Sequence, residues 1–249
     1  MNRREFVNGA AGIVVGGIPL GIAAAQEPFP SAVAGVRIVD SEIARTARAL
    51  ARAASPPYLF NHAVRTFLFG SLIGRALALK WDDEVLYLAC ILHDLGLTER
   101  FEGPLPFEIQ GAEQAKRFLE EHSYATHKAG LVWDGIAMHA SLIGHYKQAE
   151  IRLVGERAGT DVLGPDASQI KQAELDEILR TFPRLQFKKS FLQTCQDVVR
   201  KYPAGQPGPS CETSANATYR NSVHGISAMR SRTLRLPNSE PGSRAEQTR

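Results

Sequence analysis

Apolar residues recur at helical spacing through the middle of the chain, from about residue 40 to residue 201. In the segment 40–54, for example, Ile43, Ala47, Leu50 and Ala51 fall on one face of a 3.6-residue turn. No segment alternates apolar and polar residues with a period of two. We therefore predict an all-α fold, a helical bundle of seven or eight helices joined by short loops. The predicted helices cover residues 40–54, 61–79, 82–96, 110–122, 126–140, 148–158, 167–181 and 187–201.

Residues 1–25 have the features of an export signal. An arginine pair, Arg3-Arg4, precedes an apolar run from Phe6 to Ala25 in which only Asn8 is polar, and the run ends in three alanines. The arginine pair resembles a twin-arginine signal. The alternative is an uncut membrane anchor, which the many glycines of the run disfavour because glycine weakens helices. We expect a folded, exported, periplasmic protein.

The other end of the chain, residues 203–249, is rich in Pro, Gly, Ser, Asn, Thr and Arg and has no apolar period. This composition predicts a disordered tail. The folded domain is therefore expected over residues 26–202. Three cysteines among 249 residues are too few for a disulfide framework.

The net charge of +3 belongs to the two ends of the chain. Of 29 basic residues, two lie in the first segment and six in the tail; of 26 acidic residues, one and three lie there. Residues 26–202 consequently carry a net charge of −1. Nothing in this segment favours a nucleic-acid partner, and no stable membrane insertion is expected once the signal is removed.

The dipeptide His93-Asp94 ends a strongly apolar helix that spans Val85 to Leu92. Burying an unpaired carboxylate is costly, and a metal ion removes the cost by binding the carboxylate and the imidazole lone pair. Taken alone, the dipeptide favours a surface histidine beside a helix-terminal aspartate. His62, at the start of the preceding helix, and Asp161, after the segment 148–158, complete a set of two imidazoles and two carboxylates. Such a set suits a divalent ion, with Zn favoured and Fe or Mn as alternatives.

This pattern resembles the HD-domain superfamily of metal-dependent hydrolases. The family motif, His, His-Asp and a later Asp, corresponds to His62, His93-Asp94 and Asp161, and the resemblance covers about residues 55–165. The local segments look like the cyanamide-hydratase-like branch: Phe60-Asn61-His62, Leu92 to Thr98, Phe107 to Ala112 and Trp133 to His139.

The resemblance implies a metal-activated water acting on a small substrate, with hydration of a nitrile-like compound such as cyanamide as the reaction. It implies that His62, His93, Asp94 and Asp161 bind the metal. We expect Asp94 also to relay the proton and His139 and Asn61 to steady the substrate; for His139 the alternative is a packed core histidine.

Two departures bear on the substrate. Many HD phosphohydrolases have a lysine shortly after the His-Asp pair, whereas Leu97-Thr98-Glu99 stands here, which disfavours a phosphate ester. Gln110 stands where this branch often has an acid, so local hydrogen bonding is expected to differ. The alternatives are an HD-type phosphohydrolase and a non-catalytic metal- or ligand-binding HD module. A homo-oligomer is compatible with each.

Several other polar residues are weighed against the site. Arg65, one turn after His62, is expected to reach the pocket or an outer carboxylate. Glu108 and Asp134 are candidates either for bonding a ligand histidine or for surface ion pairs. The remaining histidines of the domain, His122, His127 and His145, are interpreted as lying outside the site, and Cys90 as a small buried hydrophobe.

Overall fold

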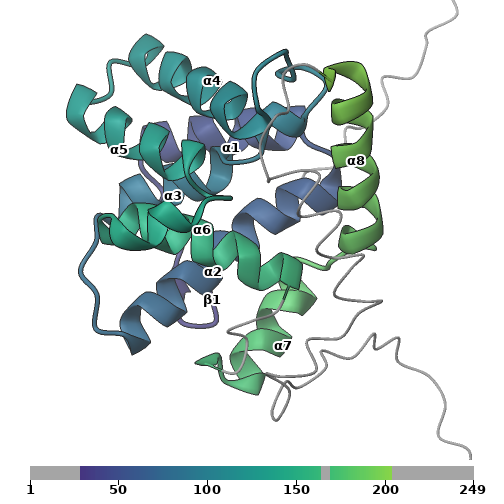
Figure 1. The fold of residues 1–249 in the computed structure, drawn as a ribbon. Helices are drawn as coiled ribbons and strands as arrows, with labels where there is room; N and C mark the ends of the chain where they lie inside the picture. The colour runs from purple at the N-terminus through teal and green to yellow at the C-terminus, as the bar shows by residue number, and fades with distance from the viewer. Residues whose placement is uncertain (1–28, 164–168, 204–249) are drawn as a thin grey trace, which may run out of the picture.

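The computed structural model describes residues 29–163 and 169–203, and this part of the chain is almost entirely helical (Figure 1). The prediction of an all-α fold is confirmed. The predicted signal, residues 1–25, and nearly all of the predicted tail lie outside the described residues. The elements are β1 (Ala32–Val33), β2 (Val36–Arg37), α1 (Glu42–Ala54), α2 (Pro57–Ala76), α3 (Asp83–Leu92), the 3-10 turn η1 (Leu95–Leu97), α4 (Phe107–Glu121), α5 (Thr126–Ala137), the 3-10 turn η2 (Leu142–Tyr146), α6 (Ala149–Leu163), α7 (Gln172–Thr181) and α8 (Phe187–Lys201).

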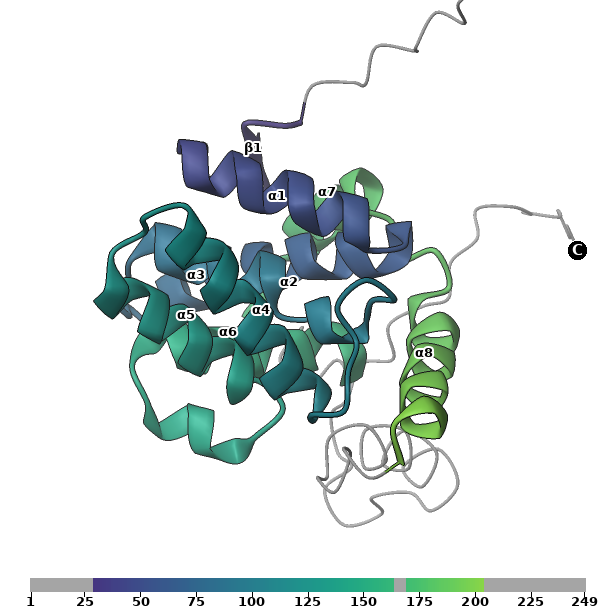
Figure 2. The same cartoon turned by 90° about the horizontal axis from the view of Figure 1, so that it is seen from above.

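Helix α3 is the centre of the bundle. Every residue from Val85 to Leu92 is buried, as expected for a helix that is apolar on all sides. It contacts α1, α2, α5 and α6, and α2 and α6 pack along one another. Figures 1 and 2 show α8 at the edge of the bundle opposite α5. The C-terminal end of α3 therefore opens into the interior of the bundle, surrounded by α2, α5 and α6.

A second, smaller apolar cluster joins α8 to the bundle. Leu59 of α2 and Leu97 of η1 pack there with Phe187, Cys195 and Val198 of α8. This cluster lies next to the segment that follows α3, so α8 closes one side of the region where α3 ends.

Helix α2 begins earlier and helix α6 ends later than the sequence predicts, and these differences change the setting of His62 and Asp161. Helix α2 begins at Pro57 instead of residue 61, because proline is tolerated at the first position of a helix. His62 consequently lies in its second turn. Helix α6 continues to Leu163, so Asp161 belongs to a helix and not to the loop after it. The hairpin of β1 and β2 was not predicted, since two residues per strand leave no period to detect.

Asp82 caps the buried helix α3, and its replacement by alanine is expected to destabilise the protein by about 1 kcal/mol. The carboxylate accepts hydrogen bonds from the backbone of Glu84 and Val85 at 3.0 and 3.1 Å and lies 2.8 Å from Lys128 Nζ. Partial burial raises the pKa of Asp82, but the bonds from Lys128, Val85 and Glu84 outweigh it and lower the pKa overall. The cap therefore stabilises the fold above the ordinary carboxyl pKa of 3.8 and is lost as the pH falls below it.

Urea unfolding at neutral pH measures this effect, with Asp82→Asn as the matched variant. Asparagine caps helices about as well as aspartate, so Asp82→Asn should retain most of the stability. An equal loss in both variants would contradict the capping role.

None of the helices formed by residues 29–163 and 169–203 combines the length and the apolar character needed to cross a bilayer.

Candidate metal centre

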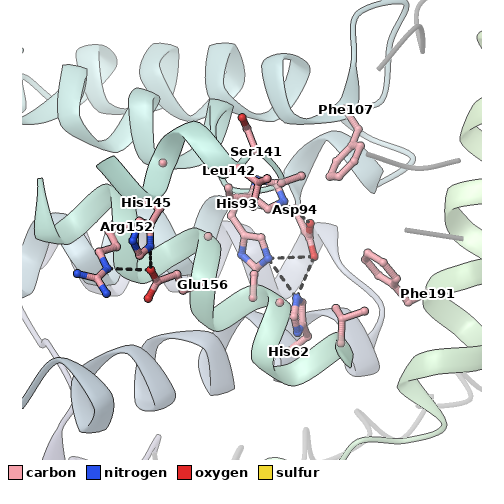
Figure 3. A pocket seen from close by; sticks show the side chains of 17 residues that line it. His62, His93, Asp94, Phe107, Ser141, Leu142, His145, Arg152, Glu156 and Phe191 are labelled. Atoms are coloured by element: carbon pink, nitrogen blue, oxygen red, sulfur yellow. Dashed lines mark hydrogen bonds and ion pairs between the residues drawn. The ribbon is translucent and has the colours of Figure 1, made fainter. Parts of the chain in front are cut away.

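His62, His93 and Asp94 meet where α3 ends (Figure 3). His93 is the last residue in helical conformation, and the backbone of Asp94 leaves the helix at φ −101°, ψ 14°. Two consecutive side chains can therefore face one point, and His62 reaches it from α2. The two imidazole Nε2 atoms are 3.2 Å apart, and Asp94 Oδ2 lies 3.2 Å from His93 Nε2 and 3.5 Å from His62 Nε2.

His139, in the segment after α5, completes the group. Its Nε2 lies 3.8 Å from Asp94 Oδ1, and its ring packs edge-on against the ring of His93 at 4.9 Å. Its side chain is only 6% exposed. The sequence left His139 open between a site residue and a packed core histidine, and in the structure its ring lies beside His93 and Asp94.

Each of the three imidazoles binds an acceptor through Nδ1, which fixes its tautomer. An oxygen of a carboxylate or a backbone carbonyl only accepts, so each Nδ1 carries the proton and each Nε2 keeps its lone pair. The Nδ1 bonds run from His62 to Asp161 Oδ2 (2.8 Å), from His93 to the carbonyl of Cys90 (2.7 Å) and from His139 to the carbonyl of Ile136 (2.7 Å).

In the neutral rings the lone pairs therefore face the Asp94 carboxylate with no hydrogen between them. Both oxygens of this carboxylate are buried, and neither has a hydrogen-bond partner within the described residues. A buried carboxylate that accepts no hydrogen bond is destabilising. A cation between the imidazoles and the carboxylate removes this cost, which is the arrangement that histidine-rich metal sites use.

Burial and the contacts between Asp94 and the histidines also shift the pKa values of the four side chains. Burial lowers the pKa of His62, and it lowers the pKa of His139 to about 4, so both rings are neutral at pH 7. Burial also acts on His93, but Asp94 outweighs it and raises the pKa of this ring. Burial opposes the charge on Asp94, yet His93, His62 and His139 together hold its pKa well below the usual range. A proton and a metal ion thus compete for the same lone pair of His93.

The donor set fits a divalent transition-metal ion. Imidazole nitrogens with one carboxylate suit Zn, Fe or Mn, whereas Mg and Ca prefer sites made of oxygen atoms. His62, His93 and Asp94 offer ligand atoms that all lie within 4.8 Å of one another.

The structure does not bring Asp161 into this group, although the sequence indicated it as a ligand. Its carboxylate lies behind the His62 ring, where it accepts from Arg65 Nε at 3.0 Å and Arg65 Nη2 at 2.6 Å, and Arg184 Nη1 lies 3.3 Å away. Burial opposes the charge on Asp161, but Arg65 and His62 hold its pKa far below the usual range. Two guanidinium groups draw the carboxylate away from the centre, so in this geometry Asp161 orients His62.

Asn61 is the second predicted site residue that lies elsewhere. Its amide donates to the carbonyl of Pro183 at 2.9 Å, and it does not line the cavity. Adjacent helical positions point about 100° apart, so with His62 facing the centre Asn61 faces the α7–α8 connection. Arg65 takes the second of its two expected roles and reaches an outer carboxylate, Asp161.

Glu108, Asp134 and Cys90 were also weighed from the sequence, and none of them lines the cavity. Glu108 is buried and Asp134 is half-buried. Cys90 is buried in the core, and burial raises the pKa of its thiol well above the ordinary value. The residue therefore packs as a small hydrophobe, as the sequence indicated.

A cavity of about 330 Å³ opens over the metal centre. Its wall is largely apolar and includes Phe107, Val162 and Phe191. Figure 3 shows His145, Arg152 and Glu156 grouped on one side of it. His145 Nδ1 and Arg152 Nε lie 2.5 and 2.8 Å from Glu156 Oε1. His145, interpreted from the sequence as outside the site, thus lies at the rim.

The sequence missed the aromatic residues around the centre. Phe187 stacks on the His62 ring with centroids 4.4 Å apart, and Phe191 lies one turn further along α8. Phe107 packs edge-on against His139 at 5.5 Å. Phe187 and Phe191 have the i, i+4 spacing that predicts one buried face, but the spacing does not say what that face covers.

Comparison with known proteins agrees with this geometry. Residues 59–173 match the family model "HD domain". The cyanamide hydratases DDI2 and DDI3 of Saccharomyces cerevisiae are each 29% identical to this chain over 170 residues, which cover 66% of this chain and 75% of each relative. An uncharacterised protein of Clostridium beijerinckii is 29% identical over 83 residues, 32% of this chain and 53% of that protein.

Proposed function

We propose that this chain, which belongs to the HD-domain family, is a metal-dependent enzyme that adds water to the carbon–nitrogen triple bond of a small nitrile-like compound such as cyanamide. One observation carries the metal: the buried, unpartnered carboxylate of Asp94 faces the lone pairs of imidazole rings. The nitrile is supported by the similarity to two cyanamide hydratases.

His62, His93 and Asp94 would hold the ion, and His139 lies next to them beside Asp94. A bound divalent ion would supply hydroxide at neutral pH, because it lowers the pKa of a water from about 15.7 toward about 7. Zn is the metal we favour, with Fe and Mn as alternatives.

The protein must also move protons. Water addition to R–C≡N puts oxygen on the carbon and both hydrogens on the nitrogen, giving an amide, or urea from cyanamide. A side chain therefore has to take one proton and return it to the nitrogen. We assign this role to Asp94, with His139 next to it: Asp94 Oδ1 and His139 Nε2 are 3.8 Å apart, and His139 is neutral at pH 7 and able to accept a hydrogen bond.

The surroundings of the centre support a neutral substrate over a phosphate ester. No lysine lines the cavity among the described residues, and Arg152 at its rim is bound to Glu156. The segment directly after the His-Asp pair, from Leu95 to Thr98, is buried and apolar apart from Thr98.

Purified protein loaded separately with Zn, Fe(II) and Mn tests the proposal by urea formation from cyanamide beside a panel of phosphomonoesters and nucleotides. We expect about one metal ion per chain and urea formation that chelation abolishes. Phosphate release faster than urea formation would overturn the nitrile substrate in favour of a phosphohydrolase. Metal well below one ion per chain after loading would instead support the non-catalytic module.

A further inference from the structure

We infer that the substrate carries an apolar group larger than anything in cyanamide, so that the enzyme acts on aryl- or branched alkyl-substituted cyanamides or nitriles. This inference rests on the proposed function and concerns the half of the cavity that faces α6. It follows from the size of the cavity, from the nature of its wall and from one helical glycine.

The cavity is too large for cyanamide. Its volume of about 330 Å³ falls within the range of small-molecule sites, roughly 300–1,000 Å³. Cyanamide has three non-hydrogen atoms and would fill only the space next to Asp94 and the histidines. The remaining space is bounded mainly by carbon atoms of residues such as Phe107, Leu142, Val162 and Phe191.

Gly159 keeps part of this space open. It lines the cavity from the interior of α6, and a Cβ built on it would meet no heavy atom within 4 Å. Glycine in a helix interior is less favourable than alanine, so packing and helix stability do not account for it here. Gly155, one turn earlier, is different: a Cβ there would come within 2.8 Å of the carbonyl oxygen of His139, and glycine is needed for this close approach.

The polar and apolar parts of the cavity also fix an orientation. The unpartnered oxygens of Asp94 lie at the metal centre, where the triple bond would have to react. Leu142 lines the cavity and is 89% exposed, so an apolar group extending from the centre toward the mouth would cover it. Burying such surface is favourable. The geometry thus points to a substrate with its nitrile at the metal and its apolar group along α6.

The variant Gly159→Leu tests the inference, with Gly130→Leu as its matched control. Gly130 is also in a helix interior, in α5, is exposed and has no heavy atom within 4 Å of a built Cβ, but it does not line the cavity. Both variants and the native protein are loaded with metal and assayed with phenylcyanamide and with cyanamide. The readout is the ratio of the two kcat/KM values.

We expect the native ratio to favour phenylcyanamide and to fall at least about tenfold in Gly159→Leu, since even one misplaced methylene changes discrimination by roughly 10- to 200-fold. The ratio should be unchanged in Gly130→Leu. Calorimetric titration with phenylurea, the product, gives a second readout, and its affinity should fall in Gly159→Leu alone.

The outcomes separate the two proposals. The protein could form urea from cyanamide but neither turn over phenylcyanamide nor bind phenylurea. This result would overturn the proposal of a larger substrate and would leave the proposal of nitrile hydration intact. Hydration of neither nitrile, with phenylurea binding that depends on Gly159, would overturn nitrile hydration and support the apolar subsite. An unchanged ratio in Gly159→Leu would overturn the role of α6 in the cavity.

Discussion

Asp94→Asn is expected to abolish metal binding and hydration together. The substitution keeps the size of the side chain but removes the charge that faces the imidazole lone pairs. Loss of a residue that merely orients a ligand costs about 10- to 100-fold in metal affinity, and we expect a larger loss here. The measurements are elemental analysis, urea formation and thermal unfolding with and without metal.

Thermal unfolding separates loss of metal from loss of fold. Metal at 100 times its Kd would stabilise the native protein by about 2.7 kcal/mol, and this gain should vanish in Asp94→Asn. Asp176→Asn, at an exposed carboxylate of α7, should keep both the gain and the activity. A metal-loaded Asp94→Asn that still forms urea would refute the role of Asp94.

Arg65→Met is expected to lower the free energy of unfolding by about 3–5 kcal/mol, because it leaves the buried carboxylate of Asp161 without its main partner. Arg65 is fully buried, donates to both oxygens of Asp161 and also donates to the carbonyls of Phe182 and Pro183 at 3.0 and 3.2 Å. Methionine has a similar length and leaves little empty space. Urea unfolding of the metal-free protein measures the change.

An exposed pair provides the contrast. Arg45 and Asp40 form an ion pair at 3.4 Å with side chains 53% and 68% exposed, so Arg45→Met should cost no more than about 1 kcal/mol. Metal affinity adds a readout, since Arg65→Met also loosens the carboxylate that orients His62. The metal affinity of Arg65→Met should fall about 10- to 100-fold. A loss of stability in Arg65→Met no larger than in Arg45→Met would show that the fold does not need the buried network.

The helices could be predicted from the sequence because an apolar period is local information. The centre needed more than that, namely the combination of His62 with His93-Asp94 and the resemblance to HD-domain proteins. The apolar run before His93-Asp94 requires a buried helix, and the next residue in the chain is the carboxylate that this burial leaves without a partner.

The orientations of the Asp161 and Asn61 side chains could not be predicted from local sequence, because their hydrogen-bond partners lie far away in the chain. Arg65 is 96 residues from Asp161, and Asn61 binds a carbonyl 122 residues away. A carboxylate near an imidazole pair has two uses, as a ligand or as a partner of the far ring nitrogen. The guanidinium groups that decide between them are apparent only after α2, α6 and the α7–α8 connection have packed together.

The contacts of Arg65 have a consequence for the order in which the protein matures. His62, His93 and Asp94 leave the ribosome long before Phe182 and Pro183. The carbonyls of these two later residues accept hydrogen bonds from Arg65, which in turn binds Asp161 behind the His62 ring. A nascent chain that ends before residue 182 therefore has all three donors of the predicted centre. It lacks the two carbonyls that hold Arg65, and through Arg65 and Asp161 these orient the His62 ring. If the centre holds a metal ion, we therefore expect tight binding only late in synthesis, after the C-terminal helices have packed against the bundle.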